Sequence, residues 1–134
     1  MDKEVSPDRI VFKIPGKAIS MNQIYAPIGR GQIMMVKKAK EFREKAILFT
    51  PYWKELKDHH NPKLSFEVWV FDRWYRKDGK GYLRKDVGNL RKVLIDAICY
   101  KWGIDDKHVW RESMYKEDMV EGEDQKIIVR VKVL

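Results

Sequence analysis

Apolar residues recur along the chain with two different periods, and each period predicts a different kind of element. Alternation rich in β-branched and aromatic residues predicts strands over 9–14, 64–71, 108–116 and 126–133. Spacings of three and four residues predict helices over 36–49 and 90–102. The second helix has one clear apolar stripe, formed by Leu90, Val93, Leu94, Ala97 and Ile98. Gly103 follows this helix, at the position where a terminating glycine is favoured.

Glycine, proline and polar residues predict how these elements are connected. Residues 15–35 are expected to form a long loop, and Thr50-Pro51 to cap and begin a short helical piece that runs to about Lys57. Residues 121–124 are expected to make a turn that joins the last two strands as a hairpin. The order strand, helix, strand, helix, strand, strand predicts one α+β domain over 1–134, with a mixed sheet of about four strands and two main helices packed on it.

Composition narrows the class of protein. The 134 residues include one cysteine, Cys99, which excludes an internal disulfide and a four-thiolate zinc site. The N-terminus has no apolar signal region, and no stretch approaches the ~18 apolar residues of a membrane span. We therefore expect a cytoplasmic protein with no membrane partner. With 28 basic and 20 acidic residues the net charge is +8, which favours an anionic partner such as nucleic acid.

The positive charge is concentrated between residues 73 and 92, where eight basic residues face only Asp78 and Asp86. Trp74, Tyr75 and Tyr82 are interleaved with them. Basic side chains attract phosphates and aromatic rings stack on unpaired bases, so this segment is a candidate nucleic-acid surface. The alternative is a solvated hairpin whose aromatic residues belong to the core. The candidate binding residues are Arg73, Arg76, Lys77, Lys80, Arg84, Lys85 and Arg91.

Carboxylates fall at both ends of the second helix. Asp86 precedes it, Asp105-Asp106 follow it, and Lys92 and Asp96 share one polar face within it. Each has a plain structural alternative: a helix cap for Asp86, a surface ion pair for Lys92 and Asp96, and a turn for Asp105-Asp106. A 13-residue helix is ~20 Å long, so spacing alone leaves open whether Asp86 and Asp106 share a site, within one subunit or across two.

These residues together resemble the core motif of the RusA-type Holliday junction resolvases. The family pattern is Asp-x-Asp-Asn-x-x-Lys, then Asp-Ala within the helix, then Asp-Asp about a dozen residues on. This chain has Asp86-Val87-Gly88-Asn89-Leu90-Arg91-Lys92, then Asp96-Ala97, then Gly103-Ile104-Asp105-Asp106. Upstream, Ile14-Pro15 with Ser20-Met21-Asn22 and Tyr25 resembles the family's Pro-x-Ser-x-Asn-x-x-Tyr start, with an insertion. The stretch Ala39-Lys40-Glu41-Phe42-Arg43 resembles the Ala-x-x-Tyr-Arg stretch of the family's first helix.

The resemblance implies a homodimeric endonuclease, encoded by bacteria or phages, that cleaves four-way DNA junctions during recombination and repair. It implies Mg²⁺ as the cofactor, with Mn²⁺ as the other candidate. By position, Asp86 and Asp106 correspond to catalytic, metal-binding aspartates, Lys92 to the essential lysine, and Asp105 to a less critical metal-site neighbour.

Gly88 departs from the family pattern, because it stands where a further metal-binding aspartate is usual. Magnesium is often held by only one or two carboxylates, so Asp86 and Asp106 can suffice. Asp78 is a weaker candidate for an additional ligand. The alternative function is a junction-binding or nucleic-acid-binding protein on the same fold, with little or no catalysis.

Overall fold

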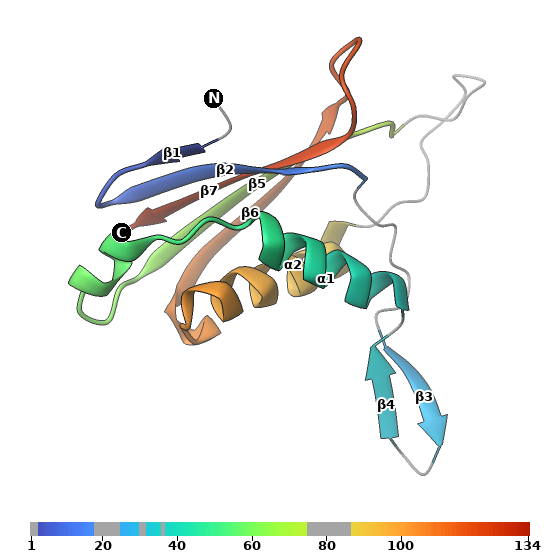
Figure 1. The fold of residues 1–134 in the computed structure, drawn as a ribbon, viewed down its shortest axis with the longest axis horizontal. Coiled ribbons are helices and arrows are strands. Elements are labelled where there is room, and N and C mark those ends of the chain that lie inside the picture. The colour runs from blue at the N-terminus through green and yellow to red at the C-terminus, as the bar shows by residue number, and fades with distance from the viewer. Residues whose placement is uncertain (1–2, 18–24, 30–31, 36, 75–86) are drawn as a thin grey trace.

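The computed structural model describes residues 3–17, 25–29, 32–35, 37–74 and 87–134. They form a single α+β domain, a five-stranded mixed sheet with the helices α1 (Lys37–Phe49) and α2 (Val87–Trp102) on one face (Figure 1). This confirms the expected fold class. The sheet has one strand more than the four expected, because the short edge strand β1 (Lys3–Val5) pairs with the next strand. Within the described residues, no helix is both long and apolar enough to span a membrane.

The remaining strands are β2 (Arg9–Pro15), β5 (Leu64–Asp72), β6 (Val109–Asp118) and β7 (Lys126–Val133). Their order in the sheet is β1-β2-β7-β5-β6. Strands β5 and β6 run parallel, and the other neighbours pair antiparallel. The strand boundaries lie close to those that alternation predicts.

The predicted hairpin of the last two strands is wrong. Strand β5 lies between β6 and β7, so the segment after β6 crosses the end of β5 before β7 begins. Burial explains the order, because β5 alternates fully buried and half-buried residues, as a central strand does, whereas β6 is largely exposed. A turn signal shows where a strand ends but carries no information about which strand lies beside it.

Two described parts of the 15–35 range are strands, where a loop was expected. Strands β3 (Tyr25–Gly29) and β4 (Gln32–Met35) pair antiparallel in a separate two-stranded sheet that projects away from the main sheet (Figure 1). The register shifts between Pro27 and Gly29. Such a bulge accommodates a proline that cannot donate to the ladder, which is why the glycine and proline content did not indicate strands.

The junction after α1 differs from the prediction as well. Thr50 does not begin a second helix; its Oγ1 donates to the carbonyl oxygen of Ala46 at 2.6 Å and closes α1. The helical piece that follows is a 3₁₀ turn, η1 (Lys54–Asp58), which begins after the buried Trp53. The turn therefore starts three residues later than the helical piece that Thr50-Pro51 predicts.

The core lies between the helices and the sheet. Alternate residues of β2, β7 and β5 are buried and lie side by side in register, as in the row Phe12, Val129, Val68. The whole predicted stripe of α2 is buried against them. The Trp102 ring lies edge-on to Phe12 and Trp53 and is tilted against Phe66, with centroids 5.4–6.4 Å apart. The C-terminal end of α2 is therefore anchored by aromatic packing.

Candidate active site

Helix α2 positions the first part of the candidate site. Because its apolar stripe is buried in the core, Lys92 and Asp96 are exposed along the other side of the helix, as the spacing predicts. Gly88 lies in the first turn of α2. Asp86 lies outside the described residues, so its cap role and its metal-ligand role both stay predictions.

A chain reversal after α2 positions the second part. Gly103 has φ +67°, and its N–H donates to the carbonyl of Tyr100, while the N–H of Ile104 donates to the carbonyl of Cys99. These two bonds close the helix in a Schellman motif, which favours glycine at this position. Asp105 then accepts from the N–H of Lys107 at 3.0 Å and caps the 3₁₀ turn η2 (Asp106–His108). The turn brings the chain back along α2.

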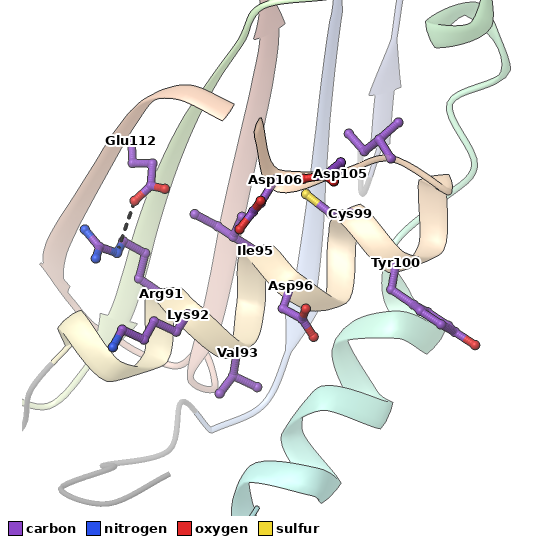
Figure 2. A pocket seen from close by; sticks show the side chains of 11 residues that line it. Arg91, Lys92, Val93, Ile95, Asp96, Cys99, Tyr100, Asp105, Asp106 and Glu112 are labelled. Carbon is purple, nitrogen blue, oxygen red and sulfur yellow. Dashed lines mark ion pairs between the residues drawn. The ribbon is translucent and has the colours of Figure 1, made fainter. Parts of the chain in front are cut away.

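The reversal creates a pocket of about 700 Å³ between α2, η2 and β6, which we call the carboxylate pocket (Figure 2). Figure 2 shows Asp105 and Asp106 entering from the segment after the helix, over the side of α2 that carries Asp96 and Cys99. Its charged lining residues are Arg91, Lys92, Asp96, Asp105, Asp106 and Glu112. The structure therefore brings Lys92 and Asp106 to one pocket, although 14 positions separate them in the chain.

Two of the pocket's carboxylates have arginine partners. Glu112 Oε2 lies 3.1 Å from Arg91 Nε, and Asp96 Oδ2 accepts from Arg43 Nε at 3.0 Å. Arg43 comes from α1, so the surface pair of Lys92 with Asp96 considered from the sequence is replaced by a pair between helices. No ion pair involving Lys92, Asp105 or Asp106 is found within the described residues.

Asp105 and Asp106 interact with each other instead. A hydrogen bond between the two carboxyl groups, together with the charge of Asp105, raises the pKa of Asp106 above its ordinary value. The pKa of Asp105 is lowered, first by the backbone N–H of Lys107 and then by the hydrogen bond from Asp106. Asp105 is thus both a turn cap and a pocket residue, which combines the structural and the functional interpretations of this pair.

Cys99 lies beneath these carboxylates, and its thiol is unreactive. Burial raises the pKa of its thiol to about 12, and the negative charges of Asp106 and Asp96 add to the effect. The thiol therefore stays protonated at neutral pH, and a thiolate nucleophile or ligand is not available here.

The basic segment is described only in part. Arg73 is exposed at the end of β5, and its backbone N–H donates to Asp72 Oδ1 at 2.7 Å. Arg91 is in the carboxylate pocket, paired with Glu112, so its charge is partly neutralised. The other predicted binding residues, together with Asp78 and two aromatic residues, lie outside the described residues: Arg76, Lys77, Lys80, Arg84, Lys85, Tyr75 and Tyr82.

The position of Trp74 contradicts the expectation that its ring is available to stack on bases. Its side chain is only 5% exposed, and its Nε1 donates to the carbonyl of Glu117 at 2.9 Å. The ring belongs to the core and is not presented to bases. Its β-strand neighbour Asp72 is also buried, so this end of β5 is a packed corner of the domain.

Sequence reasoning missed Glu112 and the link from Arg43 to Asp96. Glu112 faces the helices because it is in register with buried Phe66 on the parallel neighbour β5. The alternation of the strand could have indicated that the Glu112 side chain faces the helices. Its pairing with Arg91 could not be predicted, because it arises only from the chain reversal after α2. Within the described residues, no three His, Cys, Asp or Glu side chains are grouped as a metal site.

Comparisons with protein-family models and with curated protein sequences find no match to this chain.

Proposed function

We propose that this protein is a metal-dependent, structure-selective endonuclease of the RusA type that cleaves four-way DNA junctions as a homodimer. The observation that carries the proposal is the selective pairing of charges in the carboxylate pocket. Asp96 and Glu112 are each neutralised by an arginine, whereas no ion pair within the described residues engages Lys92, Asp105 or Asp106. The resemblance gives functional roles to those three and to Asp86, which lies outside the described residues.

The donor chemistry fits a divalent cation. Two adjacent carboxylates share a hydrogen bond and hold their pKa values apart, and a cation between or beside them relieves the repulsion. Magnesium prefers oxygen ligands and commonly takes one or two carboxylates, completing its shell with water and phosphate. Asp106 and Asp105 would hold it, with Asp86 as the expected further ligand. When bound, such an ion lowers the pKa of water and stabilises charge on a phosphodiester.

The chain's own residues supply the rest of the chemistry. The ammonium group of Lys92, at the same pocket, is suited to stabilise negative charge that develops on phosphoryl oxygens. The Arg91–Glu112 and Arg43–Asp96 pairs join α2 to β6 and to α1, so they hold the walls of the pocket in place. These four residues act as positioning residues in this proposal.

The second candidate function, a non-catalytic junction-binding protein, is favoured by Gly88. This position, in the first turn of α2, provides no carboxylate. Against it, carboxylates without a basic partner in the path of a phosphate weaken binding by repulsion, so a pure binding protein gains nothing from Asp105 and Asp106. The carboxylate pocket therefore favours the enzyme.

Incubating the protein with a labelled four-way junction in Mg²⁺, Mn²⁺ or EDTA tests the proposal. We expect paired nicks with Mg²⁺ or Mn²⁺ and none in EDTA. Asp106→Asn should lose at least about a hundredfold in cleavage and bind the junction in EDTA equally well or more tightly, because it removes a ligand and a negative charge. Asp118→Asn, an exposed aspartate at the end of β6, is the matched control.

Intact junctions in every metal, with tight junction binding, would overturn the enzyme and support the binding protein. Where the wild type cleaves, Gly88→Asp tests the missing ligand, since it should lower the Mg²⁺ concentration needed for half-maximal cleavage. Thermal unfolding of this variant separates a lost ligand from a destabilised helix start. Light scattering at micromolar concentration tests the dimer, because a four-way junction offers two equivalent strands to a two-fold assembly.

A further inference from the structure

A second cavity, of about 760 Å³, lies between η1 and the C-terminal end of α2. We call it the tyrosine groove and define it by Tyr52, Lys54, Lys57, Tyr100, Lys101 and Trp102. Its floor is built from packed indoles: Trp102 Nε1 donates to the carbonyl of Pro51 at 2.8 Å, and Trp53 Nε1 donates to that of Ser6 at 2.9 Å. Since both N–H groups are satisfied and the rings are in contact, the floor is a fixed surface.

Two tyrosines at the groove are far more exposed than large aromatic side chains usually are. Tyr52 is 75% exposed and Tyr100 is 65% exposed. A cation lies over each ring, Lys101 Nζ at 4.8 Å from the Tyr52 centroid and Arg43 Cζ at 4.8 Å from that of Tyr100. Exposed aromatic rings beside positive charge are the pattern that binds unpaired bases, which stack on the ring while their phosphates meet the charge. Because Arg43 is itself paired with Asp96, the lysines of the groove are the cations that would meet the phosphates.

The charge of the groove is one-sided. Lys54, Lys57 and Lys101 line it, and no carboxylate is among its lining residues within the described chain. Asp8 lies at one edge, 3.7 Å from His59, and is directed to that imidazole. Three lysines with two exposed aromatic rings are complementary to a ligand that carries both phosphates and planar rings.

The groove also adjoins the carboxylate pocket. Tyr100 and Ile104 line both cavities, because the Schellman turn at Gly103 places them between the helix end and the returning chain. The two cavities therefore meet at Tyr100, which is the residue that a strand occupying both would have to cross.

We propose that the tyrosine groove binds an unpaired DNA strand, with bases stacked on Tyr52 and Tyr100 and phosphates held by the three lysines. The role of that strand, as the segment next to the cleaved bond, rests on the proposed endonuclease function. Strand binding in the groove does not rest on that function, because it requires neither a metal ion nor cleavage. The groove thereby assigns the substrate class of the neighbouring site: DNA that is locally unpaired at the branch.

Fluorescence anisotropy with a labelled oligo-thymidine strand in EDTA tests the binding directly. Tyr52→Leu should weaken binding roughly tenfold, because it removes one stacking ring and keeps an apolar side chain. Tyr115→Leu is the matched control, since Tyr115 is 42% exposed and stacks on Trp69 on the other face of the sheet. Equal affinities of wild type and Tyr52→Leu would overturn the proposal.

Two further arms identify the ligand. A DNA duplex of the same length should bind with an affinity that Tyr52→Leu leaves unchanged, since its bases are already stacked; an equal loss for duplex and single strand would overturn the unpaired-strand assignment. An RNA strand that binds more tightly than DNA, with the same sensitivity to Tyr52→Leu, would overturn DNA as the occupant.

Photocrosslinking decides the question on the unaltered chain. With 5-iodouracil in the strand, crosslinks mapped to Tyr52 or Tyr100 by mass spectrometry support the groove, and crosslinks confined to other residues overturn it. The junction assay remains independent. If the protein crosslinks at Tyr52 but does not cleave junctions, the groove proposal stands and the endonuclease proposal is wrong. If the protein cleaves junctions but Tyr52→Leu does not change strand binding, the endonuclease proposal stands and the groove proposal is wrong.

Discussion

The carboxylate pocket and the tyrosine groove share Tyr100 and Ile104, yet they have opposite chemistry. The pocket contains four carboxylates, of which two are paired with arginines and two interact with each other. The groove has three lysines and no lining carboxylate within the described residues. The contrast separates two tasks that one polynucleotide poses: metal-assisted chemistry on a phosphate needs negative ligands, and holding the adjoining strand needs positive charge and flat rings.

Lys92→Ala should give the largest difference between the two functions that we assign to the cavities, cleavage and strand binding. Because Lys92 lines only the carboxylate pocket, we expect junction cleavage in Mg²⁺ to fall about a hundredfold, the scale for losing one preorganised charge at a reacting phosphate. Oligo-thymidine binding in EDTA should be unchanged. The measurement is the single-turnover rate beside the binding isotherm.

Lys40→Ala is the matched control, since Lys40 is an exposed lysine of α1 outside both cavities. A comparable loss of cleavage in this control would show that Lys92 contributes only to the general positive charge of the protein.

Removing two groove lysines should have a smaller effect, and only on strand binding. For Lys54→Gln with Lys57→Gln, the slope of log affinity against log salt should become shallower by roughly 0.7 for each phosphate that is no longer neutralised. Single-turnover cleavage of a saturating junction should change little. The pair Lys38→Gln with Lys40→Gln, exposed on α1, is the control. If both pairs reduce the slope equally, the groove is not the preferred path of the strand.

Substitutions on the face of the sheet away from the helices should change the stability of the domain and leave both cavities unaffected. Arg130 donates two hydrogen bonds to Glu67 at 2.8 and 3.0 Å on Oε1 and a third at 2.8 Å on Oε2. These bonds lower the pKa of Glu67 below its ordinary value of 4.5. The stabilisation is therefore present above pH 4.5 and is lost as the pH falls through the lowered pKa of the folded state.

Glu67→Gln should cost about 1–2 kcal/mol of unfolding free energy at pH 7, and the difference from wild type should shrink as the pH falls well below 4.5. Urea unfolding at several pH values measures it, with Glu117→Gln on the same face as the control. Junction cleavage and strand binding at pH 7 should match wild type. A loss of strand binding would indicate that nucleic acid binds on this face, and would contradict the assignment of cleavage and strand binding to the two cavities.

Local patterns predicted the elements well, because they depend on residues close together in the chain. The stripe of α2 is buried as its spacing requires, and Gly103 ends the helix with a positive φ. Strand β5 is recognisable from its β-branched and aromatic residues. Most of the predictions that were wrong concern partners: the hairpin of β6 and β7, the cap at Thr50, and the exposure of Trp74. The exception is the loop expected over 15–35, which contains the strands β3 and β4.

The same division holds for the site. Lys92, Asp105 and Asp106 were candidates from their residue types and motif spacing, and their roles remain proposals. Neither Glu112 nor Arg43 was identifiable in advance, because each acts through a partner on another element, Arg91 and Asp96. The tyrosine groove was equally invisible, since Tyr52 and Tyr100 are 48 positions apart and meet only where η1 packs beside the end of α2.

The sequence by itself determined the helices, most strand boundaries, the basic character of the chain and the residue types available for chemistry. Each of these follows from side-chain periodicity, backbone preference or charge, which neighbours within a few residues settle. The tertiary structure alone decided that β5 lies within the sheet between β6 and β7, and that the chain reverses at Gly103 so that Asp106 and Lys92 line one pocket. It also decided that arginines pair with Asp96 and Glu112, while Asp105 and Asp106 interact with each other. Those outcomes depend on burying all apolar surfaces at once, and that balance is a property of the whole domain.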